Sequence, residues 1–322
     1  MSPSPTETPD TRAAERAPVR VATVARQFDR RVSRLAVRDV LLREIGERLV
    51  ARLDYIRAAP RRVLDVGCGL GRMRAALLAR YPQAEWTGIE LSEVLARAGL
   101  REQQRAQGLA RWWRAAPQWI VADGGRLPLR AGSVDLVVSN LMLHWHPLPH
   151  TVFPEWKRVL AADGLLMFSC FGPDTLRELR AAVADALPEA APMPFVDMHD
   201  FGDMMVAAGL ATPVMDVEKL TLTFAGPREL LAEVRALGAN PRGDRPAALP
   251  SGRRARRLLD ALAAQRDASG RIALTFEVAY GHAWRPALRE DAALAGSAAG
   301  VATISVDALR GQLGFHERKG KK

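Results

Sequence analysis

Three glycines at alternating positions constrain this chain more than any other feature. The segment 63–71 reads VLDVGCGLG, so Gly67, Gly69 and Gly71 directly follow a short apolar run. Glycine permits a tight turn with positive φ and lets the backbone approach a ligand closely. The segment predicts a buried strand, a glycine-rich turn and a helix, an arrangement in which parallel α/β sheets bind their ligands.

Strand and helix patterns alternate after this glycine segment. The helices between the strands are expected over 71–80, 92–107 and 152–160. Alternating elements of this kind form parallel sheets with right-handed crossovers. The predicted fold class is therefore α/β, with a doubly wound, mostly parallel sheet whose first strands cover 61–66, 84–90, 118–122, 134–139 and 164–171.

The segments on either side of this core predict an organisation in five parts. Residues 1–20 are rich in Pro, Ser, Thr and Ala and predict a disordered leader. Helical spacing of apolar residues predicts one or two helices in an N-terminal cap over 21–60, before a core over 61–171. The structure of the tail, 286–322, is not predicted.

The segment 172–285 predicts a helical lid and the final strands of the same sheet. Asp174 is expected to cap the first helix of this segment. The last two helices are expected to lie over the ligand edge of the sheet. The predicted helices cover 174–186, 196–208, 227–237 and 253–266, and the predicted strands cover 212–224 and 271–284.

Composition limits the compartment and the partners. No run approaches the roughly 18 apolar residues of a membrane helix, and no signal-peptide pattern is present, so a cytoplasmic protein without membrane insertion is expected. Cys68 and Cys170 are too few for a disulfide framework. The chain carries 46 basic and 36 acidic residues, a net charge of +10, which favours anionic partners. Nucleic acid, anionic lipid and an acidic carrier protein all remain open on charge alone.

Polar residues end four successive predicted strands. Asp65 lies two positions before the first glycine, Glu90 ends the next strand, and Asp123 and Asn140 follow the third and fourth. The carboxyl ends of parallel strands meet at the edge where such sheets bind ligands. An acid beside the glycine turn suits a cationic amino group better than a phosphate. Together these residues predict S-adenosylmethionine as the ligand.

Five segments resemble the class I S-adenosylmethionine-dependent methyltransferases, which have a Rossmann-like fold. They are VLDVGCGLG, GIELS, ADGGRLPL, SVDLVVSNLMLHW and RVLAADGLLMFS. The resemblance implies that Asp65 and the glycine turn hold the methionine part, Glu90 the ribose, and Asp123 with Gly124 the adenine. The implied cofactor-binding residues are Asp65, Gly67, Cys68, Gly69, Gly71, Glu90, Leu91, Asp123, Gly124 and Asn140.

The flanking segments resemble the malonyl-acyl-carrier-protein O-methyltransferases, which methylate the free carboxyl of a malonyl thioester to begin the biotin precursor chain. The similar segments are VARQFDRR (24–31), SNLMLHW (139–145), EVRALGAN (233–240) and LTFEVAYGHAW (274–284). The resemblance implies malonyl-acyl carrier protein or malonyl-coenzyme A as substrate. It departs from that family at Leu35, seven positions after Phe28, where the family commonly has a tyrosine.

Such a reaction makes modest demands on side chains. A malonyl carboxylate is ionised at neutral pH and needs no general base, so alignment and exclusion of water carry the catalysis. An arginine would pair well with the carboxylate. The candidates for positioning the substrate are Arg30, Arg31 and Arg177 near the lid, with His144 and Trp145 as walls of the acceptor pocket.

Two other functions remain open. FDRR, SNLMLHW and GPDTLRELR (172–180) also resemble the methyltransferase-fold assembly factor of respiratory complex I, whose family hydroxylates an arginine, so a protein arginine hydroxylase or methylase is one alternative. A non-catalytic RNA- or protein-binding scaffold is the other. Hydroxylation needs a metal. His144, His146 and His150 have no acid or cysteine among them and are expected to be loop residues, so no metal site is predicted.

The segment 251–257, SGRRARR, places four arginines on the first turns of a predicted helix. The arginines could steer an acidic acyl carrier protein or bind RNA phosphates. They could equally form a solvated helix face. No nucleic-acid partner is expected from the sequence as a whole.

Overall fold

The structure is a computed structural model. It describes residues 19–35, 39–107, 118–187, 193–238 and 252–287. The elements below belong to one compact unit that ends at Pro286. Nearly all of the predicted leader and tail lies outside the described residues, although Val19, near the end of that leader, is buried. None of the described helices is both long enough and apolar enough to cross a membrane.

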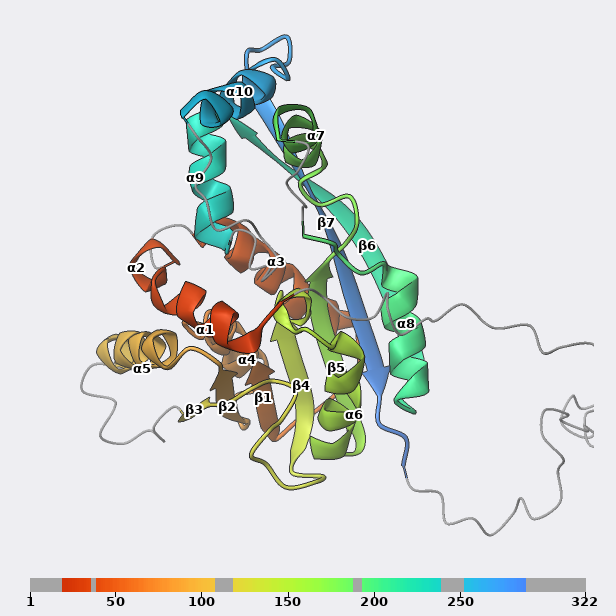
Figure 1. The fold of residues 1–322 in the computed structure, drawn as a ribbon. Helices are drawn as coiled ribbons and strands as arrows, with labels where there is room; N and C mark the ends of the chain where they lie inside the picture. Colours follow the sequence, from red (N-terminus) through yellow and green to blue (C-terminus); the bar gives the residue numbers. More distant parts are fainter. Residues whose placement is uncertain (1–18, 36–38, 108–117, 188–192, 239–251, 288–322) are drawn as a thin grey trace, which may run out of the picture. The chain divides into compact units, whose positions relative to one another are not determined.

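The core is one seven-stranded sheet (Figure 1). Its strand order is β3-β2-β1-β4-β5-β7-β6. Strands β1 to β5 run parallel, and β7 runs antiparallel to both β5 and β6. The α/β fold class is confirmed, and both late strands belong to the same sheet as predicted. The strands are β1 (Arg62–Val66), β2 (Glu85–Glu90), β3 (Gln118–Val121), β4 (Val134–Asn140), β5 (Leu160–Phe171), β6 (Ala211–Phe224) and β7 (Ile272–Trp284).

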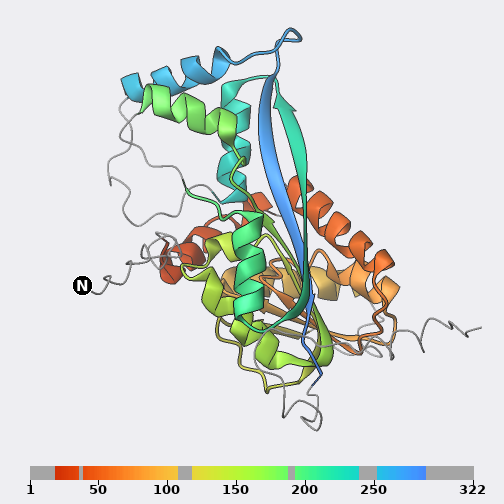
Figure 2. The ribbon, with the colours of Figure 1, turned by 90° about the vertical axis from the view of Figure 1, so that its right-hand side faces the viewer.

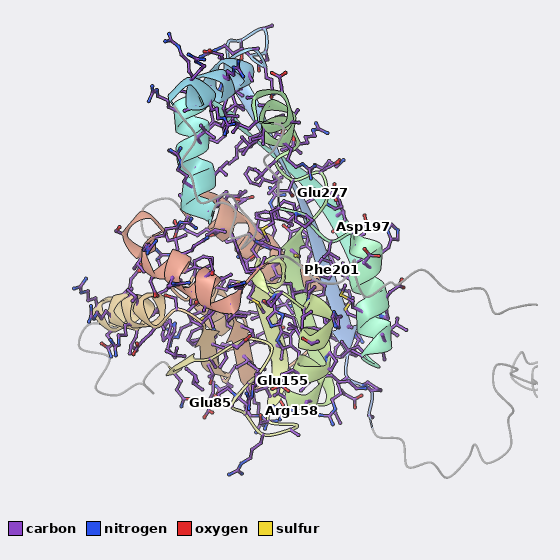
Figure 3. The ribbon with its side chains drawn as sticks, viewed as in Figure 1. Glu85, Glu155, Arg158, Asp197, Phe201 and Glu277 are labelled. Carbon is purple, nitrogen blue, oxygen red and sulfur yellow. The ribbon has the colours of Figure 1, made fainter. Side chains whose placement is uncertain are left out.

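Helices cover both faces of the parallel part of the sheet. Successive side chains of a strand point to opposite faces. Leu136 therefore packs in the cluster that contains residues of α3 (Val40–Ala51) and α4 (Arg74–Arg80), whereas Val137 packs in the cluster that contains residues of α6 (Pro149–Val159) and α8 (Met198–Ala207). Phe201 of α8 is fully buried in the second cluster (Figure 3). A fifth helix, α5 (Glu93–Gln107), lies beside β2 and β3.

The N-terminal cap contains three α-helices rather than the predicted one or two. They are α1 (Val21–Asp29), α2 (Val32–Leu35) and α3, followed by the 3-10 helix η2 (Arg52–Tyr55). The first helix ends in a tightened turn, in which the N–H of Arg31 donates to the carbonyl of Phe28 at 3.0 Å. The spacing of apolar residues alone would continue the helix past Asp29, but the structure begins a separate helix, α2, at Val32.

Strands β6 and β7 form a long ribbon that extends past the parallel core (Figure 2). Three helices cover its far end: α7 (Arg177–Ala186), α9 (Pro227–Leu237) and α10 (Gly252–Ala263). They contribute Ala182, Leu230 and Leu262 to the buried cluster that contains Ile272 and Leu274 of β7. These helices lie in the segment 172–285 in which a lid is predicted, and their role as a lid stays a prediction.

The predicted cap of α7 is wrong. Asp174 accepts a hydrogen bond from Nζ of Lys219 at 2.5 Å, and α7 begins after Leu176, which has a φ of 59°. An aspartate does cap the next helix, because Asp197 accepts from the N–H of His199 at 2.8 Å. A tertiary ion pair with β6 has thus replaced local capping at Asp174.

Candidate functional site

A pocket lies at the carboxyl ends of β1, β2 and β4. Its walls come from α1, α2 and α3, the glycine turn after β1, the 3-10 helix η4 (Leu143–Trp145) and the end of α9. Because β1 lies between β2 and β4, this is the switch point of the sheet, where α/β proteins bind ligands. The lining includes nine of the ten predicted cofactor residues: Asp65, Gly67, Cys68, Gly69, Glu90, Leu91, Asp123, Gly124 and Asn140.

Asp65 is a buried carboxylate in this pocket. It is 1% exposed, and neither of its oxygens has a hydrogen-bond partner among the described residues. Burial raises the pKa of Asp65 to about 8, a rise that the nearby Trp86 only partly offsets. A buried acid of this kind is unfavourable unless a cation pairs with it. The site is therefore prepared for a ligand that brings a positive charge.

Glu90 holds the glycine turn against the end of β2. Its Oε2 accepts from the N–H of Gly69 at 2.9 Å, and its Oε1 accepts from the N–H of Ser92 at 2.9 Å. Burial raises the pKa of Glu90, and these backbone donors oppose the rise. Each carboxylate oxygen has further lone pairs, so Glu90 can also accept from ligand hydroxyls.

All three glycines of the turn have a positive φ, which favours glycine, and two of them line the pocket. Gly67 has a φ of 73°, and a Cβ placed there would lie 2.6 Å from Cγ of Met142. Gly69 has a φ of 55°, but a Cβ there would meet only Cδ2 of Leu95, at 3.8 Å. The first glycine is therefore required by packing, and the second keeps the backbone open toward the pocket.

Gly71 does not line the pocket, unlike the other nine predicted cofactor residues. A Cβ at Gly71 would lie 2.6 Å from Cζ2 of Trp119, and Trp86 lies behind it. Close packing of the turn against β2 and β3 and a φ of 72° both explain this glycine, and its role in cofactor binding stays a prediction.

The predicted adenine side contains an acid with a histidine partner. Asp123 accepts from the N–H of Gly125 at 2.9 Å, and Nε2 of His146 lies 3.5 Å from the same oxygen. His146 lowers the pKa of Asp123. A Cβ at Gly124 would lie 2.8 Å from Cε of Met142, so the chain passes too close there for a side chain.

Asn140 has its amide committed within the protein. Its Nδ2 donates to the carbonyl of Leu42 at 2.9 Å, and its Oδ1 accepts from Oγ of Ser169 at 2.6 Å. Asn140 thus joins α3 to the ends of β4 and β5 at the base of the pocket.

Aromatic side chains form the other end of the pocket. His144 and Trp145 both line it, and their role as walls of an acceptor site stays a prediction. The rings of Phe28 and Trp145 pack edge to face with their centroids 5.3 Å apart, and the ring centroids of Phe171 and His144 are 5.0 Å apart. Burial lowers the pKa of His144 to about 3, so this histidine is neutral at pH 7. Nδ1 of His144 lies 3.7 Å from Sγ of Cys170.

The three arginines predicted to position a substrate do not line the pocket. Arg30 is exposed, and it and Arg31 follow the end of α1, where the turn interrupts the helix face that carries Val24 and Phe28 into the pocket. Arg177 begins α7 on the ribbon and donates to Glu178 at 3.0 Å. Their role in positioning a substrate stays a prediction.

Two charged residues that the sequence analysis missed do line the pocket. Nε of Arg72 donates to Oδ2 of Asp39 at 2.6 Å, and its Nη1 pairs with Glu102. Arg72 directly follows the last glycine of the turn, and a polar residue in that place is the signal that could have identified it. Leu35, the departure from the resembling family, also lines the pocket and is buried.

An ion pair supports the loop that follows Asp123. Glu155 and Arg158 of α6 lie at the end of the sheet away from α1 (Figure 3). Glu155 accepts from the N–H of Leu127 at 2.7 Å, and Arg158 donates to the carbonyls of Leu127 and Leu129. These contacts fix the loop from outside the pocket.

No group of three or more His, Cys, Asp or Glu side chains within the described residues could hold a metal ion. His144 and His146 instead face aromatic rings and Asp123, respectively.

Known proteins are similar to this chain over most of its length. The family described as "Methyltransferase domain" matches residues 64–168. Malonyl-[acyl-carrier protein] O-methyltransferase from Laribacter hongkongensis is 45% identical over 268 residues, 83% of this chain and 90% of the relative. The protein of the same name from Halorhodospira halophila is 42% identical, over 81% of this chain and 86% of the relative.

A solved structure supports the fold. The YcgJ protein from Bacillus subtilis matches with a TM-score of 0.52 at 15% identity, over 74% of this chain and 99% of that protein. With relatives at this level of identity along nearly their full length, the chain belongs to the malonyl-[acyl-carrier protein] O-methyltransferase family.

Proposed function

We propose that this protein transfers a methyl group from S-adenosylmethionine to the free carboxylate of malonyl-acyl carrier protein, as a step of biotin synthesis. The observation that carries the proposal is the buried carboxylate of Asp65, which has no partner among the described residues and faces a pocket with an aromatic far end. Family membership supplies the substrate class. The cytoplasm is the proposed setting, because Cys68 and Cys170 are both free and buried.

The cofactor would be held by the strand-end residues. Asp65 would pair with the ammonium of the methionine part, Glu90 would accept from the ribose hydroxyls, and Asp123 with the Gly124 backbone would contact the adenine. The fit rests on the buried Asp65 and on the remaining lone pairs of Glu90. When bound, S-adenosylmethionine supplies an electrophilic methyl group, so a C–O bond to the malonyl carboxylate forms as the C–S bond breaks and no proton moves.

His144 is suited to orient the carboxylate without holding it as a full ion pair. Burial raises the pKa of the Cys170 thiol to about 12, so the thiol stays protonated and can donate to Nδ1 of His144. The imidazole proton then remains on Nε2, where it can donate to a substrate oxygen. A neutral donor orients the nucleophile while leaving most of its charge available for attack.

The aromatic wall serves to exclude water. Phe28, Trp145 and Phe171 surround the acceptor end together with Leu237 of α9. Removing water from a carboxylate and holding it in line with the methyl group lowers the barrier through proximity and desolvation.

The proposal is tested by mass spectrometry of malonyl-acyl carrier protein after incubation with the protein and S-adenosylmethionine, with no metal added. We expect the carrier-bound acyl group to gain one methyl, and saponification to remove it, as for an ester. The variant Asp65→Ala should lose the product, whereas Glu85→Ala, an exposed change on the neighbouring strand β2, should not. Binding of S-adenosylmethionine without methylation of the malonyl thioester would overturn the proposed substrate assignment. Labelling of a protein arginine instead would favour the side-chain-modifying alternative.

A further inference from the structure

Helix α10 carries an exposed basic face. Arg253, Arg254, Arg256 and Arg257 are all exposed, and we name these four residues the α10 basic face. At 100° per residue, Arg253, Arg256 and Arg257 lie on one side of the helix and Leu262 on the opposite side. Leu262 is fully buried and packs in the cluster shared with α7 and α9. The helix is therefore anchored by its apolar side and presents its cations outward.

Three arginines of this face lie beside few acids. Asp260 is the single acid in the sequence of α10, four positions after Arg256. No ion pair joins Arg253, Arg256 or Arg257 to an acid in the part of the chain that the structure describes. By contrast, Arg72 and Arg158 each bond to acids of the core. Arg253, Arg256 and Arg257, with one acid in the same helix, produce a local positive potential.

Helix α9 connects the α10 basic face to the pocket. α10 packs against α9, and the last residue of α9, Leu237, lines the pocket. A Cβ at the next residue, Gly238, would lie 2.2 Å from Trp145, so this end of α9 touches the acceptor wall. The 11 residues of α9 span about 16 Å at 1.5 Å per residue. Figure 1 shows α10 across the end of α9 that lies away from α2.

We propose that the α10 basic face docks the acyl carrier protein that delivers the malonyl group. This inference rests on the proposed function. Acyl carrier proteins are small acidic proteins that hold their acyl group on a long, flexible phosphopantetheine arm. Charge complementarity would hold the body of the carrier at α10. The arm would run beside α9 and place the malonyl group at the aromatic end of the pocket. The face thus selects the carrier, and the pocket selects the acyl group.

The test compares a carrier-bound substrate with one that lacks both carrier and phosphate. The variant R253E/R256E/R257E reverses three charges of the face. The control R101E/R105E/R130E reverses three exposed arginines elsewhere and has the same net charge. We expect the first variant to lower kcat/KM for malonyl-acyl carrier protein by about tenfold or more, mainly by slowing association. For malonyl-pantetheine, kcat/KM should stay within about twofold of the wild type. The control should keep both values.

Direct binding separates this inference from the proposed function. Fluorescence anisotropy of labelled carrier protein should show weaker binding to the α10 variant, and the wild-type affinity should fall as salt is added. Wild-type binding of the carrier without any methyl transfer would overturn the proposed function and leave the docking surface standing. Equal carrier affinity for the wild type, the α10 variant and the control would overturn the docking surface. Tighter binding of a short RNA than of the carrier would also overturn it.

Folding is checked by thermal unfolding of each variant. If the charge reversals prevent folding, R253Q/R256Q/R257Q removes the same charges without adding acids. Its expected effect on carrier affinity has the same direction and a smaller size. Unchanged carrier affinity in that variant would overturn the docking surface.

Discussion

The backbone N–H of Gly69 donates a hydrogen bond of 2.9 Å to Oε2 of Glu90, which joins the glycine turn after β1 to the end of β2. Oε1 of the same carboxylate accepts from the N–H of Ser92, whose hydroxyl donates to Asp29 of α1 at 2.5 Å. Two buried side chains, Glu90 and Ser92, therefore connect the glycine turn, the second strand and the N-terminal cap. Changes in the turn should affect both stability and cofactor binding.

Gly67 and Gly69, two of the three glycines of this turn, should respond differently to alanine. Gly67→Ala and Gly69→Ala both place a side chain at positive φ, which costs about 1–2 kcal/mol. Gly67→Ala should lose more, because its Cβ would overlap Met142. Urea unfolding measures the difference, and Met142→Ala in the Gly67→Ala background should recover part of the excess loss. Equal losses for the two glycines would contradict the packing role of Gly67.

Asp65 should make the ligand-free protein less stable as the pH rises. The folded-state pKa of about 8 lies above the ordinary value of 3.8, so between these values the folded state holds a proton that the unfolded state has released. Stability should fall through this window by at most about 1.4 kcal/mol per pH unit and level off above pH 8. Asp65→Asn should remove this contribution and be the more stable protein at pH 8. Melting temperatures of the wild type and Asp65→Asn, measured from pH 5 to pH 9, test this prediction. The same pH dependence in both proteins would contradict it.

Cofactor binding at pH 7 should release about one proton per site, because an ammonium beside Asp65 favours the ionised carboxylate. Calorimetric titrations of S-adenosylmethionine in phosphate and in Tris should therefore give different apparent enthalpies. Asp65→Asn should bind more weakly and show no such buffer dependence. Identical enthalpies for the wild type in both buffers would rule out a protonated Asp65 in the free protein.

The ion pair between Arg72 and Asp39 should contribute to stability. Asp39 is 8% exposed, so Arg72→Gln leaves a largely buried carboxylate without its cation and should cost about 1–3 kcal/mol. Arg97→Gln is the matched control, because Arg97 pairs with Glu93 in an exposed i,i+4 pair expected to contribute about 0.5 kcal/mol. Adding Asp39→Asn to Arg72→Gln should restore part of the loss. A similar loss of stability in Arg72→Gln and Arg97→Gln would contradict a larger contribution from the pair of Arg72 and Asp39.

His144 should act without titrating. Because its pKa is about 3, kcat/KM for the malonyl substrate at saturating cofactor should not change through its ionisation between pH 6 and pH 8. His144→Gln keeps a neutral hydrogen-bond donor and should retain most of the activity. His144→Phe keeps the ring without the donor and should lose about tenfold in kcat/KM, the effect of one hydrogen bond. A wild-type profile with a pKa near 6.5 that disappears in His144→Gln would contradict a neutral histidine.

The parallel core could be predicted because its signals are local. The apolar runs of β1, β2 and β4 and the acids that end β1 and β2 stand in the sequence beside the elements they define. Parallel pairing then brings Asp65 and Glu90 to one edge without further information. The two antiparallel strands were predicted from their β-branched and apolar content.

The missed features depend on contacts between distant parts of the chain. Asp174 and Asp197 both precede a helix, but only Asp174 has Lys219 within reach, so only Asp197 caps. Arg72 and Asp39 are 33 positions apart and meet through the packing of α3 beside the glycine turn. The periodicity of apolar residues does not show which residues distant in the chain lie close together in the fold.

The position of α1 couples the two halves of the pocket. Phe28 contacts Trp145 at the acceptor end, and it also packs in a cluster with Leu91, the neighbour of Glu90. One nine-residue helix therefore closes over both the donor side and the acceptor side. Because Phe28 contacts Trp145 and packs beside Leu91, any displacement of α1 would open both ends of the pocket together.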